Sequence, residues 1–109
     1  DQAAVRAGSE LASEPDVLAE IGRIIGETYY ALGDYAAAMT QYDRVLAELP
    51  ADMDAAALAR LRNARVGALV ELSRLADARQ SIESALADAS RALGAEHPQT
   101  QRLASKRVW

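Results

Sequence analysis

The sequence predicts an all-α protein of about six helices that pair as antiparallel hairpins. Apolar residues recur at the three- and four-residue spacing that puts side chains on one face of a helix, and no stretch alternates with period two as a half-buried strand would. Proline and glycine fall between these segments or near their ends, apart from Gly22, Gly26 and Gly67. The connections are therefore short, and short connections make consecutive helices pack antiparallel.

The first regular pattern begins at Pro15 and ends before Gly33, which suits a left-handed residue after a helix end. Asp34 can then cap the next helix, predicted from residue 35 to a stop at Pro50. Further helices are predicted over about 54–72 and 75–93, the latter ended by Gly94. A helix over about 2–13 and another from about residue 98 complete the count.

Composition excludes several classes of function. The 109 residues carry a net charge of −4, which argues against a nucleic-acid-binding segment, and the absence of cysteine removes disulfides and thiolate metal sites. No apolar run approaches the roughly 20 residues of a membrane span, and the N-terminus does not read as a signal peptide. We expect a cytoplasmic protein without membrane contact or cofactor. Abundant alanine, and arginine in excess over the single Lys106, suggest a bacterial genome rich in GC.

Spaced small, aromatic and aliphatic residues mark the segment 19–50. They are Ile25, Gly26, Tyr29, Leu32, Gly33, Tyr35, Ala38, Tyr42 and Pro50. In these positions the segment resembles the tetratricopeptide repeat; only Gly22, at a tryptophan-type position, and Val45, at the second alanine, depart. Gly26 and Ala38 are small, so the two helices can cross closely while Tyr42 fills the space beside them.

A second, less regular copy follows about 40 residues downstream, with Val66, Leu69, Leu72, Ser73, Leu75, Ala78, Ile82 and Ala85 in the same roles. Arg65 stands where an apolar residue is expected and Val66 where a small one is, so we expect its first helix to be shifted or more loosely packed. The segment 93–100 resembles the linker of a longer variety of the repeat, found in kinesin light chains and bacterial signalling proteins.

The resemblance implies a right-handed α-solenoid covering the chain as a single fragment, 1–109. It divides into a half repeat (1–14), a repeat (15–51), a second repeat (52–96) and a half repeat (97–109), with Val108 where the small residue of a third repeat belongs. A repeat cannot bury its apolar face alone. The half repeats should therefore expose apolar surface, through which the chain could form a homo-oligomer.

In this family the first helices of successive repeats line a concave groove that holds a peptide. The resemblance puts there Glu20, Arg23, Ile24, Glu27, Tyr30, Arg60, Asn63, Ala64, Gly67 and Val70. An amide donates and accepts at once, so Asn63 suits a peptide main chain. Arg23 and Ser105 stand at its equivalent places, so no asparagine ladder forms. The lysine-asparagine pair with which chaperone-binding members grip a carboxylate is also missing.

No catalytic or metal-binding residues are predicted. His97 is the only histidine, and the linker resemblance gives it a structural role at the start of the next helix. Acidic pairs such as Asp52 and Asp54 lie at helix ends, where they favour the helix dipole or face solvent. No catalytic triad order, phosphate loop or dinucleotide fingerprint is present.

The sequence thus predicts a non-enzymatic protein-protein interaction or scaffold module that binds a protein or peptide in its groove. By association with the family, it would be part of a larger bacterial regulatory or signalling protein, such as a transcription factor or a kinase. Two alternatives remain: a spacer that mediates dimerisation, and a regulatory segment of a multidomain enzyme.

Overall fold

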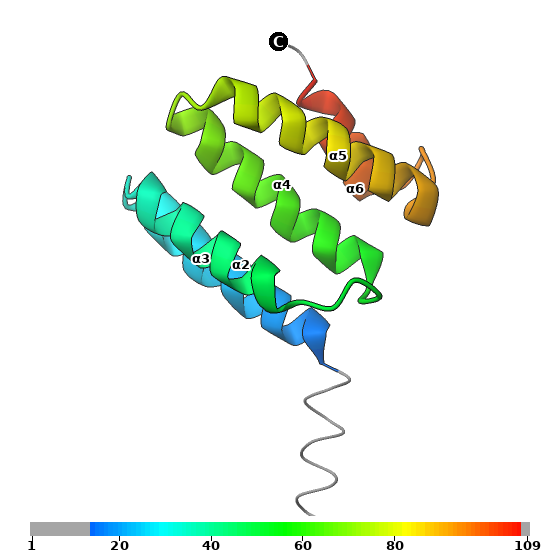
Figure 1. The fold of residues 1–109 in the computed structure, drawn as a ribbon, viewed down its shortest axis with the longest axis horizontal. Helices are drawn as coiled ribbons and strands as arrows, with labels where there is room; N and C mark the ends of the chain where they lie inside the picture. Colours follow the sequence, from blue (N-terminus) through cyan, green and yellow to red (C-terminus); the bar gives the residue numbers. More distant parts are fainter. Residues whose placement is uncertain (1–13, 108–109) are drawn as a thin grey trace, which may run out of the picture.

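The computed structural model describes residues 14–107, and this part of the chain contains helices and no strands. The helices are α2 (Pro15–Ala31), α3 (Tyr35–Glu48), α4 (Ala55–Glu71), α5 (Leu75–Leu93) and α6 (Pro98–Ser105) (Figure 1). The all-α prediction is confirmed, and the predicted boundaries agree closely with these bounds. The helix predicted over about 2–13 and the position of Val108 lie outside the described residues.

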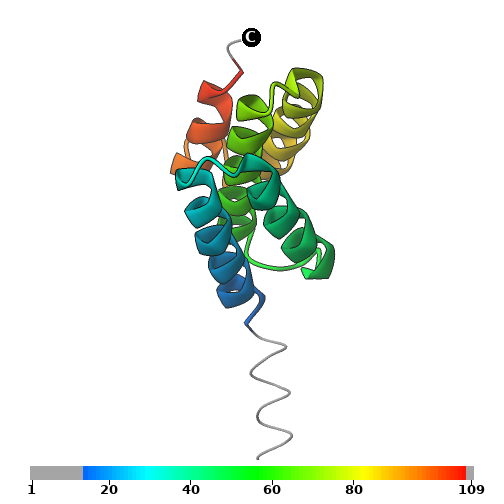
Figure 2. The ribbon, with the colours of Figure 1, turned by 90° about the vertical axis from the view of Figure 1, so that its left-hand side faces the viewer.

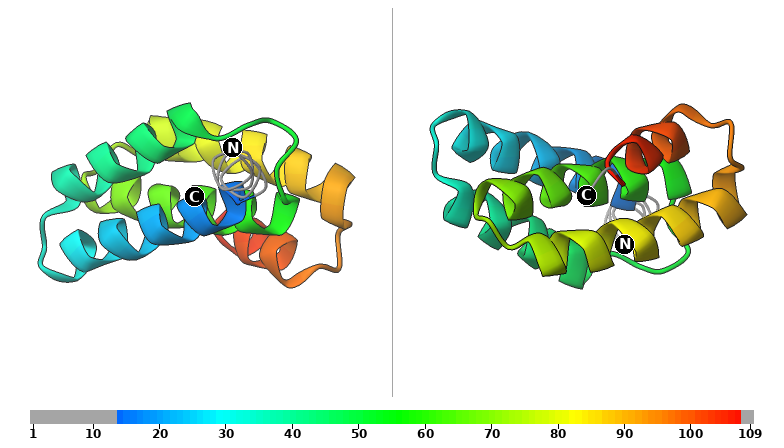
Figure 3. Two further views of the ribbon diagram at one scale, coloured as in Figure 1. Left: turned by 90° about the horizontal axis from the view of Figure 1, so that it is seen from below. Right: turned by 90° about the horizontal axis from the view of Figure 1, so that it is seen from above.

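The helices form two layers. Helices α2 and α3 make one antiparallel hairpin and α4 and α5 a second, while α6 packs against α4 and α5. In the side view, α2 and α6 lie on the left, α3 and α5 lie on the right, and α4 lies between them (Figure 2). The views from below and above show the same arrangement (Figure 3). Helix α4 contacts the other four helices and is the centre of the structure. This is the hairpin stacking of a tetratricopeptide-like solenoid.

The two hairpins have the same turn. After α2, the backbone N–H of Asp34 donates to the carbonyl of Tyr29, and Gly33 adopts a φ of 82°. After α4, the N–H of Arg74 donates to the carbonyl of Leu69, and Ser73 adopts a φ of 59°. This left-handed residue satisfies the last carbonyls of the helix and reverses the chain. Glycine adopts it freely, whereas a serine at this position carries strain.

Side-chain caps fix where three helices begin. The Asp34 carboxylate accepts from the N–H of Ala37 at 3.1 Å, and Asp54 accepts from that of Ala57 at 3.0 Å. His97 caps α6, with its Nδ1 accepting from the Gln99 N–H at 3.1 Å. Such caps satisfy N–H groups that have no partner within the helix. The structural role predicted for His97 therefore agrees with its place before Pro98.

Helices α2 and α3 cross where two glycines face two large side chains. A Cβ on Gly26 would lie 2.2 Å from Cε1 of Tyr42, and one on Gly22 would lie 2.4 Å from Cγ2 of Val45. Both departures from the repeat signature are thus explained together, because Val45 occupies the space that Gly22 leaves. Relative to the repeat signature, the large side chain at this contact lies on α3, as Val45, and not on α2.

The core is continuous across both hairpins. Tyr42, Leu61, Val66, Leu69 and Ile82 are fully buried at its centre, and a smaller cluster of alanines surrounds Leu103 between α4, α5 and α6. The expected loose packing of α4 is not found, because no part of Val66 is exposed.

Arg65, the other irregular residue of α4, spans the two hairpins. Its guanidinium donates to Asp43 of α3 at 2.6 Å and to Ser81 of α5 at 2.9 Å. A polar bridge thus replaces the apolar contact that the repeat signature expects there.

The two glycines Gly26 and Gly67 predict opposite effects of the same substitution. Gly26→Ala forces a methyl group into the Tyr42 ring and should lower the free energy of unfolding by about 1 to 3 kcal/mol. Gly67 has only the Tyr30 ring near, at 3.8 Å, so Gly67→Ala should raise it by about 1 kcal/mol through helix propensity. Urea unfolding of both variants measures this, and equal effects would contradict the close crossing.

The exchange between Gly22 and Val45 predicts a strong coupling. Val45→Ala should cost about 2 kcal/mol by leaving a cavity, and Gly22→Ala should clash with Val45. In the double variant the new methyl group occupies part of that cavity. The stability lost by the double variant should therefore be smaller than the sum of the two single losses by about 1 to 2 kcal/mol. A double-mutant cycle of unfolding free energies provides the test, and simple additivity would refute the exchange.

Candidate partner-binding groove

A pocket of about 280 Å³ lies over the layer formed by α2, α4 and α6. Its lining comes from all three helices, and Tyr42 of α3 reaches it from the second layer. The lining residues are Arg23, Glu27, Tyr30, Tyr42, Arg60, Asn63, Ala64, Gly67, Gln99, Arg102 and Lys106. Three successive first helices thus contribute to one concave surface.

The structure brings most of the predicted groove residues together. Of the residues predicted from the sequence, Arg23, Glu27, Tyr30, Arg60, Asn63, Ala64 and Gly67 line the pocket. Three others do not. Ile24 belongs to the exposed side of α2, Val70 packs against the core, and Glu20 lies beside the pocket, where it pairs with Arg23. Ile24, Val70 and Glu20 therefore do not line this pocket.

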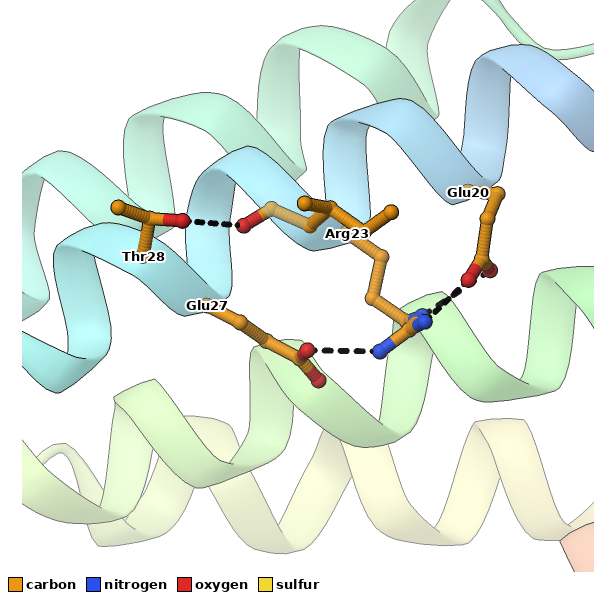
Figure 4. Close-up of polar contacts among 5 residues, drawn as sticks. Glu20, Arg23, Glu27 and Thr28 are labelled. Atoms are coloured by element: carbon orange, nitrogen blue, oxygen red, sulfur yellow. Dashed lines mark hydrogen bonds and ion pairs between the residues drawn. The ribbon is translucent and has the colours of Figure 1, made fainter.

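At the α2 end of the groove the charges are already paired. Figure 4 shows the guanidinium of Arg23 between two carboxylates of its own helix: it bonds to Glu20 on one side and to Glu27, at 2.7 Å, on the other. The hydrogen bond from Arg23 holds the pKa of Glu20 below its usual range. The same two carboxylates raise the pKa of Arg23, so this arginine stays charged and locally neutralised. With one arginine and two glutamates, the cluster carries a net charge of −1.

At the α6 end the positive charges are free. Within residues 14–107, Arg60, Arg102 and Lys106 form no ion pair, although all three line the pocket. Burial lowers the pKa of Lys106, since its ammonium has lost hydration without gaining a counter-charge. The groove is therefore electrically asymmetric, acidic at α2 and basic at α6, in a chain whose net charge is negative.

Polar atoms without partners lie at the base of the groove. The Tyr42 hydroxyl, Asn63 Oδ1 and Gln99 Oε1 are buried and have no hydrogen-bond partner among the described residues. Burial raises the pKa of Tyr42 to about 12, so its hydroxyl keeps its proton and can donate. Buried polar groups are almost always paired, because desolvating one without compensation costs about 1 to 3 kcal/mol. These three atoms are suited to a polar chain lying in the groove.

Tyr30 forms the rim between α2 and α4. Its hydroxyl donates to Glu71 of α4 at 3.3 Å, and its ring meets that of Tyr35 edge to face, with centroids 5.0 Å apart. Burial raises the pKa of Tyr30. The ring is held in place from both sides and presents a fixed aromatic edge beside Gly67, where no side chain narrows the groove.

Four lining residues were missed by the sequence analysis. Tyr42 was interpreted only as a packing residue, and Gln99, Arg102 and Lys106 lie on a helix treated as an incomplete repeat. Two of them could have been predicted from the repeat length, because the positions one long repeat after Arg60 and Ala64 are Arg102 and Lys106. Ser105, in contrast, does not line the pocket, and its hydroxyl donates to the carbonyl of Arg102 at 2.7 Å.

The fold and this pocket define a helical-repeat protein with a concave surface. A family profile for the tetratricopeptide repeat matches residues 57–99, which cover α4, α5 and the first residues of α6. No curated protein and no solved structure matches the chain. Over residues 57–99 the chain is therefore similar to the tetratricopeptide repeat family. The matched copy is the one whose signature is less regular, and the α2–α3 hairpin repeats its geometry.

Two further observations concern what the described residues contain. Across residues 14–107 no helix is long and apolar enough to cross a membrane. In the same range no group of three histidine, cysteine or acidic side chains is arranged to hold a metal ion. Repeats of this family are interaction modules in general.

Proposed function

We propose that this chain binds an extended or helical segment of a protein partner in the groove of α2, α4 and α6. The observation that carries the proposal is the set of unpaired polar atoms from Tyr42, Asn63 and Gln99 beneath one concave surface. A partner's main chain supplies N–H and C=O groups at regular spacing, which are the complements these atoms need. The family match over residues 57–99 supports the same role.

The wider context is part of the proposal. We place the chain in a larger bacterial regulatory or signalling protein of the cytoplasm, with no catalysis by this segment and no nucleic acid bound to it. The alanine-rich and arginine-rich composition and the negative net charge support this view. The fold alone does not decide it, because helical repeats serve many functions. We also propose that the repeats are of the longer, kinesin-light-chain-like variety.

A second candidate function is self-association, and one observation favours it. Helix α2 buries only small residues, while one side of it exposes a stripe of large aliphatic side chains. The stripe consists of Val17, Leu18, Ile21, Ile24 and Ile25, each 39% to 51% exposed. Contiguous apolar surface of this kind marks a contact with another protein surface, either a neighbouring repeat or a second copy.

Replacing three groove side chains should abolish partner recovery. In a pulldown with the full-length protein as bait, Arg23→Ala/Arg60→Ala/Asn63→Ala removes two cations and the central amide, and recovery should fall at least tenfold, about 1.4 kcal/mol. The matched control is Arg44→Ala/Arg74→Ala/Gln80→Ala, whose three residues are exposed on or before α3 and α5. Unchanged recovery by the groove variant would count against the proposal.

The self-association candidate predicts a concentration-dependent dimer. Light scattering after size exclusion should then show a dimer at high concentration for the wild type and a monomer for Ile21→Glu, because the new carboxylate would have to be buried in the interface. Ala36→Glu, an exposed site on α3, is the control and should leave the dimer intact. A wild-type chain that stays monomeric would remove this candidate.

A further inference from the structure

We propose that the α4–α6 half of the groove seats acidic side chains of an internal, extended segment of the partner. The inference rests on the proposed peptide-binding function and adds the chemistry of the ligand. It follows from two independent features of the same half-groove: cations that form no ion pair within residues 14–107, and buried polar atoms that have no hydrogen-bond partner there.

The first feature is the placement of charge. Arg60 of α4, Arg102 of α6 and Lys106 directly after α6 line one pocket and form no ion pair within the described range. Arg23 at the other end already holds two carboxylates. Elsewhere in the described residues several arginines have partners, as Arg62 does with Asp88 at 2.7 Å and Arg65 with Asp43 at 2.6 Å. Of the cations without an ion pair in residues 14–107, Arg44 and Arg79 lie outside the pocket and the other three line it, where an anionic ligand is their complement.

The second feature is the buried base of this half-groove. Gln99 is only 6% exposed and Tyr42 is fully buried, yet Gln99 Oε1 and the Tyr42 hydroxyl have no partner. An amide oxygen accepts from a main-chain N–H, and a phenol donates to a carbonyl. A peptide that moved the covering side chains aside on binding would satisfy these atoms, and it would direct its own side chains toward the cations on either side.

The distribution of the cations favours an internal segment over a single chain end. Three positive charges that form no ion pair within residues 14–107 stand on α4, on α6 and directly after α6, whereas one terminal carboxylate supplies one negative charge. An extended chain directs alternate side chains to opposite sides, so two or more acidic residues in one segment can reach Arg60 on α4 and the pair on α6. The groove also continues past α4 to the α2 end, where Arg23 is already paired, which leaves room for the chain to extend.

Three labelled peptides test the ligand chemistry by fluorescence anisotropy with the intact chain. The first alternates glutamate with leucine and serine and has an amidated C-terminus, the second replaces each glutamate with glutamine, and the third is the glutamine peptide with a free C-terminus. The glutamate peptide should bind at least about tenfold more tightly than either of the others, because each charged contact contributes a factor of this order.

Matched protein variants locate the binding. Arg60→Gln/Arg102→Gln/Lys106→Gln should weaken the glutamate peptide at least about tenfold. Arg44→Gln/Arg74→Gln/Arg91→Gln changes the net charge equally at exposed sites outside the pocket and should stay within about twofold, since distant charges are screened. Tyr42→Phe removes only a buried, unpaired hydroxyl; it should keep the fold, as circular dichroism can verify, and weaken the glutamine and glutamate peptides by similar factors.

The outcomes separate this inference from the proposed function. Equal binding of the glutamate and glutamine peptides would overturn the acidic ligand while leaving a peptide groove intact. If the peptide with the free C-terminus bound more strongly than the glutamate peptide, the ligand group would be a terminal carboxylate and not an acidic side chain. If both triple variants lost the same affinity, the binding would reflect only attraction by the overall charge. No binding of the glutamate peptide would also overturn it, whereas a neutral peptide selected by display and lost in the groove variant would preserve the proposed function.

Discussion

The close crossing of α2 and α3 is the constraint on which the first repeat depends. Because Gly22 and Gly26 carry no side chains, Val45 and Tyr42 can pack directly against the α2 backbone. Because its ring packs at Gly26 between the two helices, Tyr42 also lines the groove from the second layer. A single packing requirement therefore fixes the hairpin and also supplies a polar atom to the binding surface. It also leaves α2 with its large aliphatic residues facing outward.

Helix α4 joins this hairpin to the rest of the molecule in two ways. Its apolar residues Leu61, Val66 and Leu69 complete the core, while Arg62 and Arg65 link it to the helices of the second layer. Arg60, Asn63 and Ala64 of the same helix line the groove and form no such links among the described residues. Packing and recognition are thus divided between faces of one helix, which is how a repeat can change its ligand without changing its fold.

Much of the fold follows from the sequence because helix patterns and caps are local. Pro15, Gly33, Asp34 and Gly94 mark boundaries that the structure reproduces. The groove was harder to predict, because which face of a helix is covered depends on neighbours. Ile24 was assigned to the groove from its register, yet it does not line the pocket and is 51% exposed. The unpaired Gln99 and Tyr42 atoms depend on three helices meeting, and no local pattern encodes that.

The central claim is that the concave face of α2, α4 and α6 is the surface that meets a partner, and an NMR titration tests it most directly. Asn63 is the only asparagine in the chain, so its side-chain amide gives one identifiable pair of signals. On adding the glutamate peptide, the side-chain amides of Asn63 and Gln99 and the backbone signal of Gly67 should shift together, while Gln80 on α5 stays fixed. Shifts at Gln80 and along α3 and α5, with Asn63 unmoved, would contradict the account.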